Sequence, residues 1–125
     1  MDSKRLVGMN GESLACTFLE KKGYQILDRN FSSRYGELDI IAKKEDEYVF
    51  VEVKTRSQWS AKMVSGEESV TSAKRKRMLQ TIQVYFAKKN FEFEIPWRCD
   101  VIVIEVHRHH YRIIHYPYAF EVYIS

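Results

Sequence analysis

Four charged residues, two in each of two short segments, have types and spacing that could support chemistry: Glu37, Asp39, Glu52 and Lys54. Their segments, 35–43 and 48–55, are rich in β-branched and apolar residues and are predicted to be strands. Side chains two positions apart share one face of a strand, so Glu37 and Asp39 share a face with Ile41, and Glu52 shares one with Lys54. The polar cluster at 44–47 is typical of a hairpin turn between them.

A symmetric hairpin would set Asp39 opposite Glu52 and Glu37 opposite Lys54. Two carboxylates that face each other across strands repel, and a divalent cation between them relieves that repulsion. Magnesium prefers one or two protein carboxylates together with water and phosphate oxygens. The pattern therefore predicts a site for Mg²⁺ or Mn²⁺ held by Asp39 and Glu52, with Glu37 in support.

Lys54 would lie beside that metal as a compact positive charge. Such a charge can orient a water molecule or stabilise a pentacovalent phosphate, and a metal-activated water needs no protein nucleophile. The chemistry indicated is phosphodiester hydrolysis. Two plainer interpretations remain open: the four residues are outward-facing charges on a half-exposed hairpin, or Glu37 only pairs with Lys54.

The rest of the chain predicts the elements that must position these residues. In order, they are a helix at 11–22, strands at 24–30, 35–43 and 48–55, a helix from Thr71 or Ser72 to about Asn90, and strands at 99–106 and 111–116. The first strand is expected at an edge and the near-continuous apolar strand 99–106 in the interior. This α-β-β-β-α-β-β order predicts an α/β fold, with a mixed central sheet of about five strands flanked by helices.

Composition is that of one globular domain spanning residues 1–125. The chain is 45% hydrophobic and 30% charged, which excludes disordered and collagen-like classes. The charged N-terminus never reaches an apolar signal region and no stretch is long enough to span a membrane, so we expect a cytoplasmic protein without a membrane partner. Cys16 and Cys99 are isolated from other metal ligands and are expected to be reduced core thiols.

Basic residues near the second helix and beside the strand motifs predict contacts with phosphate. The net charge is only +3, but residues 74–77 form one block of four cations. Such a block can neutralise backbone phosphates, and helix N-terminal amides add donors, although basic runs are often merely solvated. The residues expected to bind nucleic acid are Arg34, Arg56, Thr71, Lys74, Arg75 and Arg77.

Histidines and aromatic residues elsewhere favour structural roles. The histidines at 107, 109 and 110 lie in a polar turn without an acidic partner in sequence, which is typical of a surface feature. The C-terminal aromatic residues are expected to pack in the core or between the subunits of a homodimer. Trp59 is the exception, because it lies in the polar segment 56–68, an expected mobile surface loop, where it could stack on bases.

Two motifs, GELDII at 36–41 and FVEVKTR at 50–56, resemble those of the PD-(D/E)xK nuclease superfamily. The chain looks more closely like the YraN-like family of uncharacterised bacterial proteins, which are similar to archaeal Holliday junction resolvases. Matching positions also occur at 8–12, 22–24 and 98–101, so the resemblance covers most of the chain. Ser32, Cys99 and the loop at 58–66 depart from the family pattern, in positions that concern substrate contacts.

The resemblance implies a restriction-endonuclease-like fold and a magnesium-dependent endonuclease that acts on DNA, including branched or structured DNA. By similarity, Asp39 and Glu52 are metal ligands, Lys54 is the catalytic lysine and Glu12 completes the acidic cluster. Glu12 has an equally good alternative as an acid favoured by a helix dipole. The competing functions are a non-catalytic nucleic-acid-binding module that retains the nuclease scaffold and a protein-interaction adaptor that uses the aromatic tail.

Overall fold

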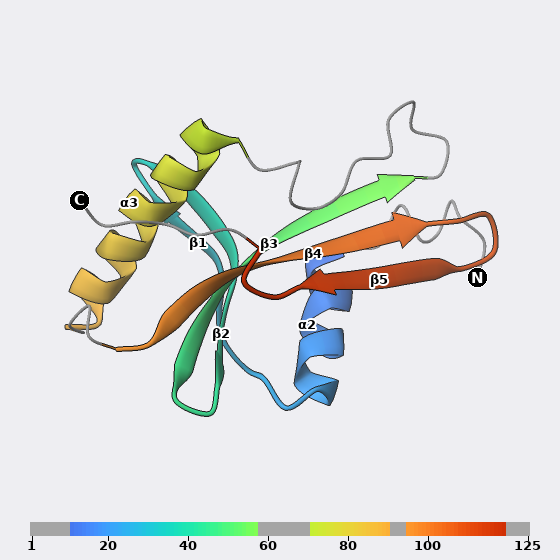
Figure 1. Ribbon diagram of the computed structural model, residues 1–125, viewed down its shortest axis with the longest axis horizontal. Coiled ribbons are helices and arrows are strands. Elements are labelled where there is room, and N and C mark those ends of the chain that lie inside the picture. The colour runs from blue at the N-terminus through green and yellow to red at the C-terminus, as the bar shows by residue number, and fades with distance from the viewer. Residues whose placement is uncertain (1–10, 58–70, 91–94, 120–125) are drawn as a thin grey trace.

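A computed structural model describes residues 11–57, 71–90 and 95–119 of the chain (Figure 1). The elements are α2 (Gly11–Lys21), β1 (Gln25–Ser33), β2 (Gly36–Lys44), β3 (Glu47–Ser57), α3 (Ser72–Lys88), β4 (Trp97–Val106) and β5 (Tyr111–Tyr116). The predicted order of elements is confirmed. The largest difference in a boundary is at β1, which continues to Ser33.

The five strands form one mixed sheet in the order β1-β2-β3-β4-β5. β1, β2 and β3 pair in antiparallel fashion, β3 and β4 pair in parallel, and β5 returns antiparallel to β4. A parallel pair needs a crossover connection, and α3 lies on that connection. The predicted α/β fold is confirmed, with β1 at an edge and β4 in the interior, and it is consistent with a restriction-endonuclease-like architecture.

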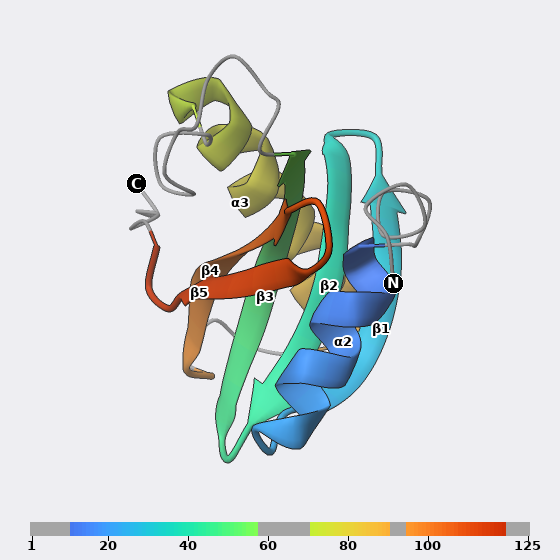
Figure 2. The same ribbon diagram turned by 90° about the vertical axis from the view of Figure 1, so that its right-hand side faces the viewer.

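The two helices cover opposite faces of the sheet, and each face has its own apolar core. Figure 2 shows α2 lying against β1 and β2, on the other side of the sheet from α3. Residues of α2 such as Leu19 pack with Ile40 and Val51, whereas residues of α3 such as Ile82 pack with Phe50. Burial from both sides explains why β4 is buried continuously from Cys99 to its end.

Both cysteines are buried and free, as expected of core thiols. Burial raises the pKa of the Cys16 thiol, and it raises that of Cys99 to about 12, so neither is an accessible thiolate near neutral pH. Arg56 and Ser57 belong to β3, so the expected loop at 56–68 starts later than predicted. Trp59 and the rest of that loop lie outside the described residues.

The strand alternation assumed for β2 breaks between Leu38 and Ile41. Strict alternation would put these two side chains on opposite faces, yet both pack in the core beneath α3. Regular alternation therefore does not extend through Asp39 and cannot by itself assign that side chain to the face of Ile41. Asp39 lies beside Glu12 of α2. The local change in direction comes from packing of Leu38, which is fully buried.

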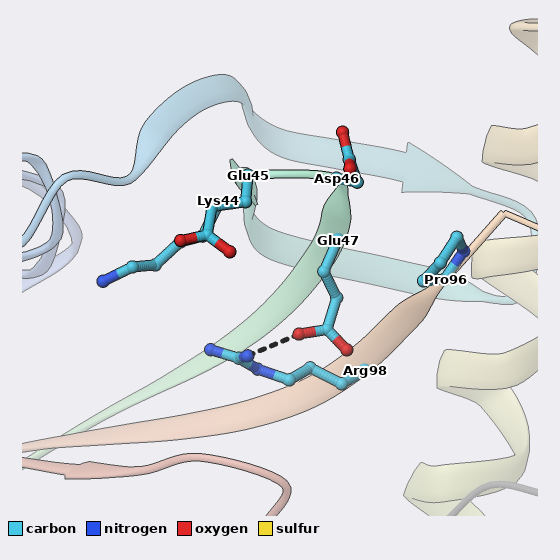
Figure 3. Close-up of a pocket in the computed structure, with 6 residues that line it drawn as sticks. All are labelled: Lys44, Glu45, Asp46, Glu47, Pro96 and Arg98. Atoms are coloured by element: carbon cyan, nitrogen blue, oxygen red, sulfur yellow. Dashed lines mark hydrogen bonds and ion pairs between the residues drawn. The ribbon is translucent and has the colours of Figure 1, made fainter.

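The amino ends of β3 and β4 are joined by a charged network around Arg98. Its guanidinium lies 2.6 Å from Glu47 Oε1 and donates to Asp100 and to the Tyr24 hydroxyl, and the Arg98–Glu47 pair borders a surface hollow (Figure 3). The Asp100 carboxylate is fully buried and lies 2.7 Å from His115 Nε2. These contacts satisfy a charge inside the sheet, at the far end of β3 from Lys54.

No helix in the described part of the chain is long and apolar enough to cross a lipid bilayer.

Candidate metal centre

Three carboxylates from two elements converge at one end of the sheet. Glu12 of α2 and Glu37 and Asp39 of β2 each offer an oxygen, and these oxygens lie within 4.8 Å of one another. Glu12 reaches this position because α2 starts directly against β3. Gly11 permits that contact, since a Cβ at this position would collide with Thr55 Oγ1.

Asp39 lies where the ladder between β2 and β3 ends. The pairing follows the predicted register, but the last described pair is Ile40 with Val51, one position before Asp39 and Glu52 would meet. Beyond that pair, a side-chain hydrogen bond links the two strands: Asp39 Oδ2 accepts a hydrogen bond of 2.8 Å from the Val53 N–H. A carboxylate is thereby fixed between two strands.

The electrostatic surroundings of Asp39 disfavour its charged form. Burial and the nearby negative charge of Glu52 raise the pKa of Asp39 to about 7, and Glu12 adds to the effect. The hydrogen bond from Val53 lowers the pKa only in part. Asp39 and Glu52 are thus close enough to repel each other, as the hairpin register indicates, although they are not a backbone-paired couple.

Glu52 is buried, with a side chain only 7% exposed, and two lysines neutralise it. Lys54 Nζ lies 3.3 Å from Glu52 Oε1, and Lys74 Nζ contacts the same oxygen. The alternative pairing of Lys54 with Glu37 is wrong, because Glu37 instead accepts a hydrogen bond from Ser32 Oγ at 3.3 Å. Glu52 therefore stands beside the three converging carboxylates, with its charge balanced by lysines.

Lys74 is positioned by the start of α3. Thr71 is the N-cap residue, and its side chain accepts a hydrogen bond of 3.2 Å from the Lys74 N–H. The predicted cap is confirmed, and it uses the Thr71 hydroxyl that we expected to contact nucleic acid. Lys74 was predicted only to contact phosphate. Its contact with Glu52 was not predicted, because the two residues are distant in sequence.

The remaining predicted nucleic-acid contacts divide between two sides of the site. Arg77 is exposed and, with Lys74, lines a small hollow that also includes Gly36 and Glu37. Arg34, in the exposed turn before β2, donates to the Tyr35 hydroxyl at 2.6 Å.

Two further arginines of the predicted set are partly buried. Arg75 is half-buried on α3. Arg56 lies on the other side of the site, at the end of β3, where it contacts Glu105.

The site brings together four carboxylates and several cations. The four carboxylates are Glu12, Glu37, Asp39 and Glu52. Described cations near them include Lys54, Lys74, Arg77, which lines a hollow with Glu37, and Arg29, whose Nη2 lies 3.9 Å from Glu12 Oε2. Clustered carboxylate oxygens are the donors that hard divalent cations prefer.

Comparison with known proteins places this chain in a family. Residues 11–104 match the profile of Uncharacterised protein family UPF0102. The chain belongs to this family. The predicted YraN-like membership is confirmed.

Relatives of this UPF0102 chain come from diverse bacteria. The UPF0102 protein of Syntrophomonas wolfei is 43% identical over 116 residues, covering 93% of this chain and 98% of the relative. That of Roseiflexus castenholzii is 38% identical over 113 residues, covering 89% and 90%. That of Caldanaerobacter subterraneus is 41% identical over 102 residues, covering 82% and 81%.

One buried acidic residue of this UPF0102 chain, Glu105, is not among the predicted site residues. Glu105 is buried, and its Oε1 lies 2.7 Å from His107 Nε2. The prediction that the histidine turn has no acidic partner in sequence is therefore wrong for His107, because the partner is two positions earlier. A charged residue inside a strand covered on both faces was the available signal. His109 and His110 are exposed, as predicted.

Proposed function

We propose that this UPF0102 protein is a metal-dependent endonuclease that hydrolyses phosphodiester bonds of DNA, with branched or structured DNA as the expected substrate. One observation carries the proposal: Glu12, Glu37 and Asp39 offer oxygens within 4.8 Å of one another, beside a glutamate that holds two lysines. Like charges that converge from separate elements destabilise each other, and a bound cation would relieve that repulsion.

The carboxylates suit Mg²⁺ or Mn²⁺ in chemistry and nearly in spacing. Both are hard cations that take carboxylate, water and phosphate oxygens. Two oxygens bound to one Mg²⁺ at about 2.1 Å can be at most about 4.2 Å apart, so a small closing movement of these side chains suffices. Asp39 and Glu52 remain the ligands proposed from the sequence, and Glu12 and Glu37 add two more carboxylates to the same place.

When bound, the metal would act as a Lewis acid on a phosphoryl oxygen and lower the pKa of a water molecule. Asp39, with a pKa of about 7, would release any proton it carries when the cation binds. Glu12 and Glu37 would add negative charge that attracts the cation. Hydrolysis at this site would therefore need no nucleophilic side chain from the protein.

The two lysines would act on the phosphate. Their side chains are 35% exposed at Lys54 and 28% exposed at Lys74, so both can meet a substrate. A lysine ammonium beside the scissile group stabilises the negative charge that grows during in-line attack. Glu52 holds both ammonium groups in place, and Arg77 adds positive charge on the α3 side of the site.

The test compares Asp39→Asn with Asp46→Asn, a matched change at an exposed residue in the turn between β2 and β3. Each protein is assayed with Mg²⁺ and with Mn²⁺ on duplex, nicked, flapped and four-way DNA. We expect wild type and Asp46→Asn to cleave at least one substrate and Asp39→Asn to lose at least 100-fold in rate.

Binding of the same DNA is measured in parallel in EDTA. Salt-sensitive binding by wild type without cleavage of any substrate would refute the nuclease and leave the non-catalytic binding module. Equal cleavage by Asp39→Asn and wild type would refute the assigned site.

A further inference from the structure

Three charged residues form a row across the sheet at the carboxyl ends of β3 and β4. Arg56 on β3 is the register partner of Glu105 on β4, and Glu105 is the register partner of Arg112 on β5. We call these three residues the arginine row. Neighbouring strands lie about 4.8 Å apart, so the row brings two guanidinium groups to the two sides of one carboxylate.

Glu105 holds both arginines. Its side chain is only 2% exposed, and its oxygens lie 3.3 Å from Arg56 Nη2 and 3.1 Å from Arg112 Nη2. His107 Nε2 lies 2.7 Å from the same carboxylate. Burial alone would raise the pKa of Glu105, but the hydrogen bonds from His107 and Arg56 and the charge of Arg112 lower it overall. Glu105 is therefore a fixed anion with an excess of cations around it.

The arginine row keeps donors that Glu105 does not use. The side chain of Arg112 is 63% exposed, and Glu105 is its one ion-pair partner among the described residues. Arg56 is more buried, with a side chain 17% exposed, so Arg112 offers most of the accessible donors. A guanidinium has five N–H donors in a planar fork that matches a phosphate. Two arginines against one carboxylate leave a net positive charge before His107 is counted.

The row lies next to the candidate metal centre, on the same side of the sheet. Arg56 follows Lys54 by two positions on β3, so their side chains share a face about 7 Å apart along the strand. Figure 1 shows the carboxyl ends of β3 and β4 extending beyond α3. The hollow lined by Lys74 and Arg77 lies at the starts of β2 and α3, whereas the row lies on β3, β4 and β5.

We propose that the arginine row binds a backbone phosphate adjacent to the scissile phosphate, with Arg112 as the contact and Glu105 as the positioning residue. This inference rests on the proposed function, because it takes the nucleic-acid strand to cross the carboxylates. A polynucleotide carries a phosphate at every nucleotide, so a strand held at Lys54 presents its next phosphates within reach of the row. The row makes no base-specific contact, since phosphate contacts position the strand without specifying sequence.

The experiment measures binding of a short fluorescein-labelled DNA duplex by fluorescence anisotropy in EDTA, over a range of salt concentrations. The variants are Arg112→Gln and Glu105→Gln. Arg108→Gln is the matched control, because it removes the same charge from an exposed position in the turn between β4 and β5. Thermal unfolding of each protein verifies that it is folded at the assay temperature.

We expect Arg112→Gln to weaken binding about 5- to 10-fold near physiological salt and to reduce the slope of log affinity against log salt by about 1. Glu105→Gln, if folded, should weaken binding less and leave that slope nearly unchanged, because it removes no phosphate contact. Arg108→Gln should resemble wild type. Equal affinities and slopes for Arg112→Gln and Arg108→Gln would overturn the proposal.

Cleavage is scored separately, so that failure of the arginine row is distinguishable from failure of the nuclease. A wild type that binds DNA through Arg112 but never cleaves it would refute the proposed function and retain the row. A wild type that cleaves DNA at a rate unaffected by Arg112→Gln, with unchanged binding, would refute the row and retain the nuclease.

Discussion

The surroundings of Asp39 disfavour the ionised form of its carboxyl group. The residue is partly buried, close to Glu52 and Glu12, and has a pKa of about 7. One backbone hydrogen bond does not compensate for two neighbouring acids. Functional sites commonly carry such destabilising groups, because the charge is needed for binding rather than for folding.

The stability of the protein should therefore depend on pH through Asp39. The folded pKa is above the ordinary value of 3.8, so the folded state binds more protons than the unfolded state between about pH 4 and pH 7. The contribution of protonated Asp39 to the stability of the folded state is complete below that pH window and is lost as the pH rises through it. In EDTA at pH 8, Asp39→Asn should raise the free energy of unfolding by about 1 to 2 kcal/mol, a value reduced by solvent screening of a partly exposed group.

Urea unfolding of wild type, Asp39→Asn and Asp46→Asn at pH 4 and pH 8 measures this effect. The gain should be mostly lost at pH 4, where Asp39 is protonated in the folded state and about half protonated in the unfolded state. An Asp39→Asn variant that is less stable than wild type at pH 8 would mean that the carboxylate has a structural role.

Lys74 should matter to stability as well as to any reaction. Lys74→Gln leaves buried Glu52 with one lysine, so the free energy of unfolding in EDTA should fall by about 1 to 2 kcal/mol. Lys76→Gln, an exposed change on the same helix, should alter it by less than about 0.5 kcal/mol. Equal stabilities of the two variants in urea unfolding would contradict the ion pair.

At the scale of elements, the predicted hairpin and the observed one agree in register and differ in the direction of side chains. Ile41 pairs with Phe50 as symmetry about the turn requires. The break in alternation at Leu38 could not be predicted, because it depends on how that side chain packs beneath α3, which local sequence does not encode. The position of Glu12 likewise depends on the docking of α2.

Gly11 sets that docking and gives an independent test of it. Gly11→Ala would place a Cβ against Thr55 Oγ1, and the β-branched threonine has little freedom to turn away. We expect the variant to lose about 1 to 3 kcal/mol of stability and to bind divalent metal more weakly, because Glu12 moves with the helix.

Addition of Thr55→Ala removes the obstructing hydroxyl and should restore much of both properties. Unfolding and metal titration of the single and double variants measure the rescue. Equal losses in the two variants would show that the contact is not the cause.

At the scale of the whole molecule, the two ends of the parallel strand pair have different tasks. Arg98 and Asp100 satisfy buried charge at the amino ends of β3 and β4, whereas the arginine row lies at their carboxyl ends, near the converging acids of α2 and β2. The element order, the mixed sheet and the hairpin carboxylates were predictable from periodicity and motif spacing. The row was not, because its members become neighbours only when β5 returns beside β4.

The central claim is that Asp39 and Glu52, together with Glu12 and Glu37, hold a divalent cation. Isothermal titration calorimetry of Mn²⁺ into wild type, Asp39→Asn and Asp46→Asn tests it without any choice of DNA substrate. The account predicts saturable binding to wild type and to Asp46→Asn, and at least a tenfold loss of affinity in Asp39→Asn. Identical isotherms for all three proteins, or no heat of binding to wild type, would contradict it.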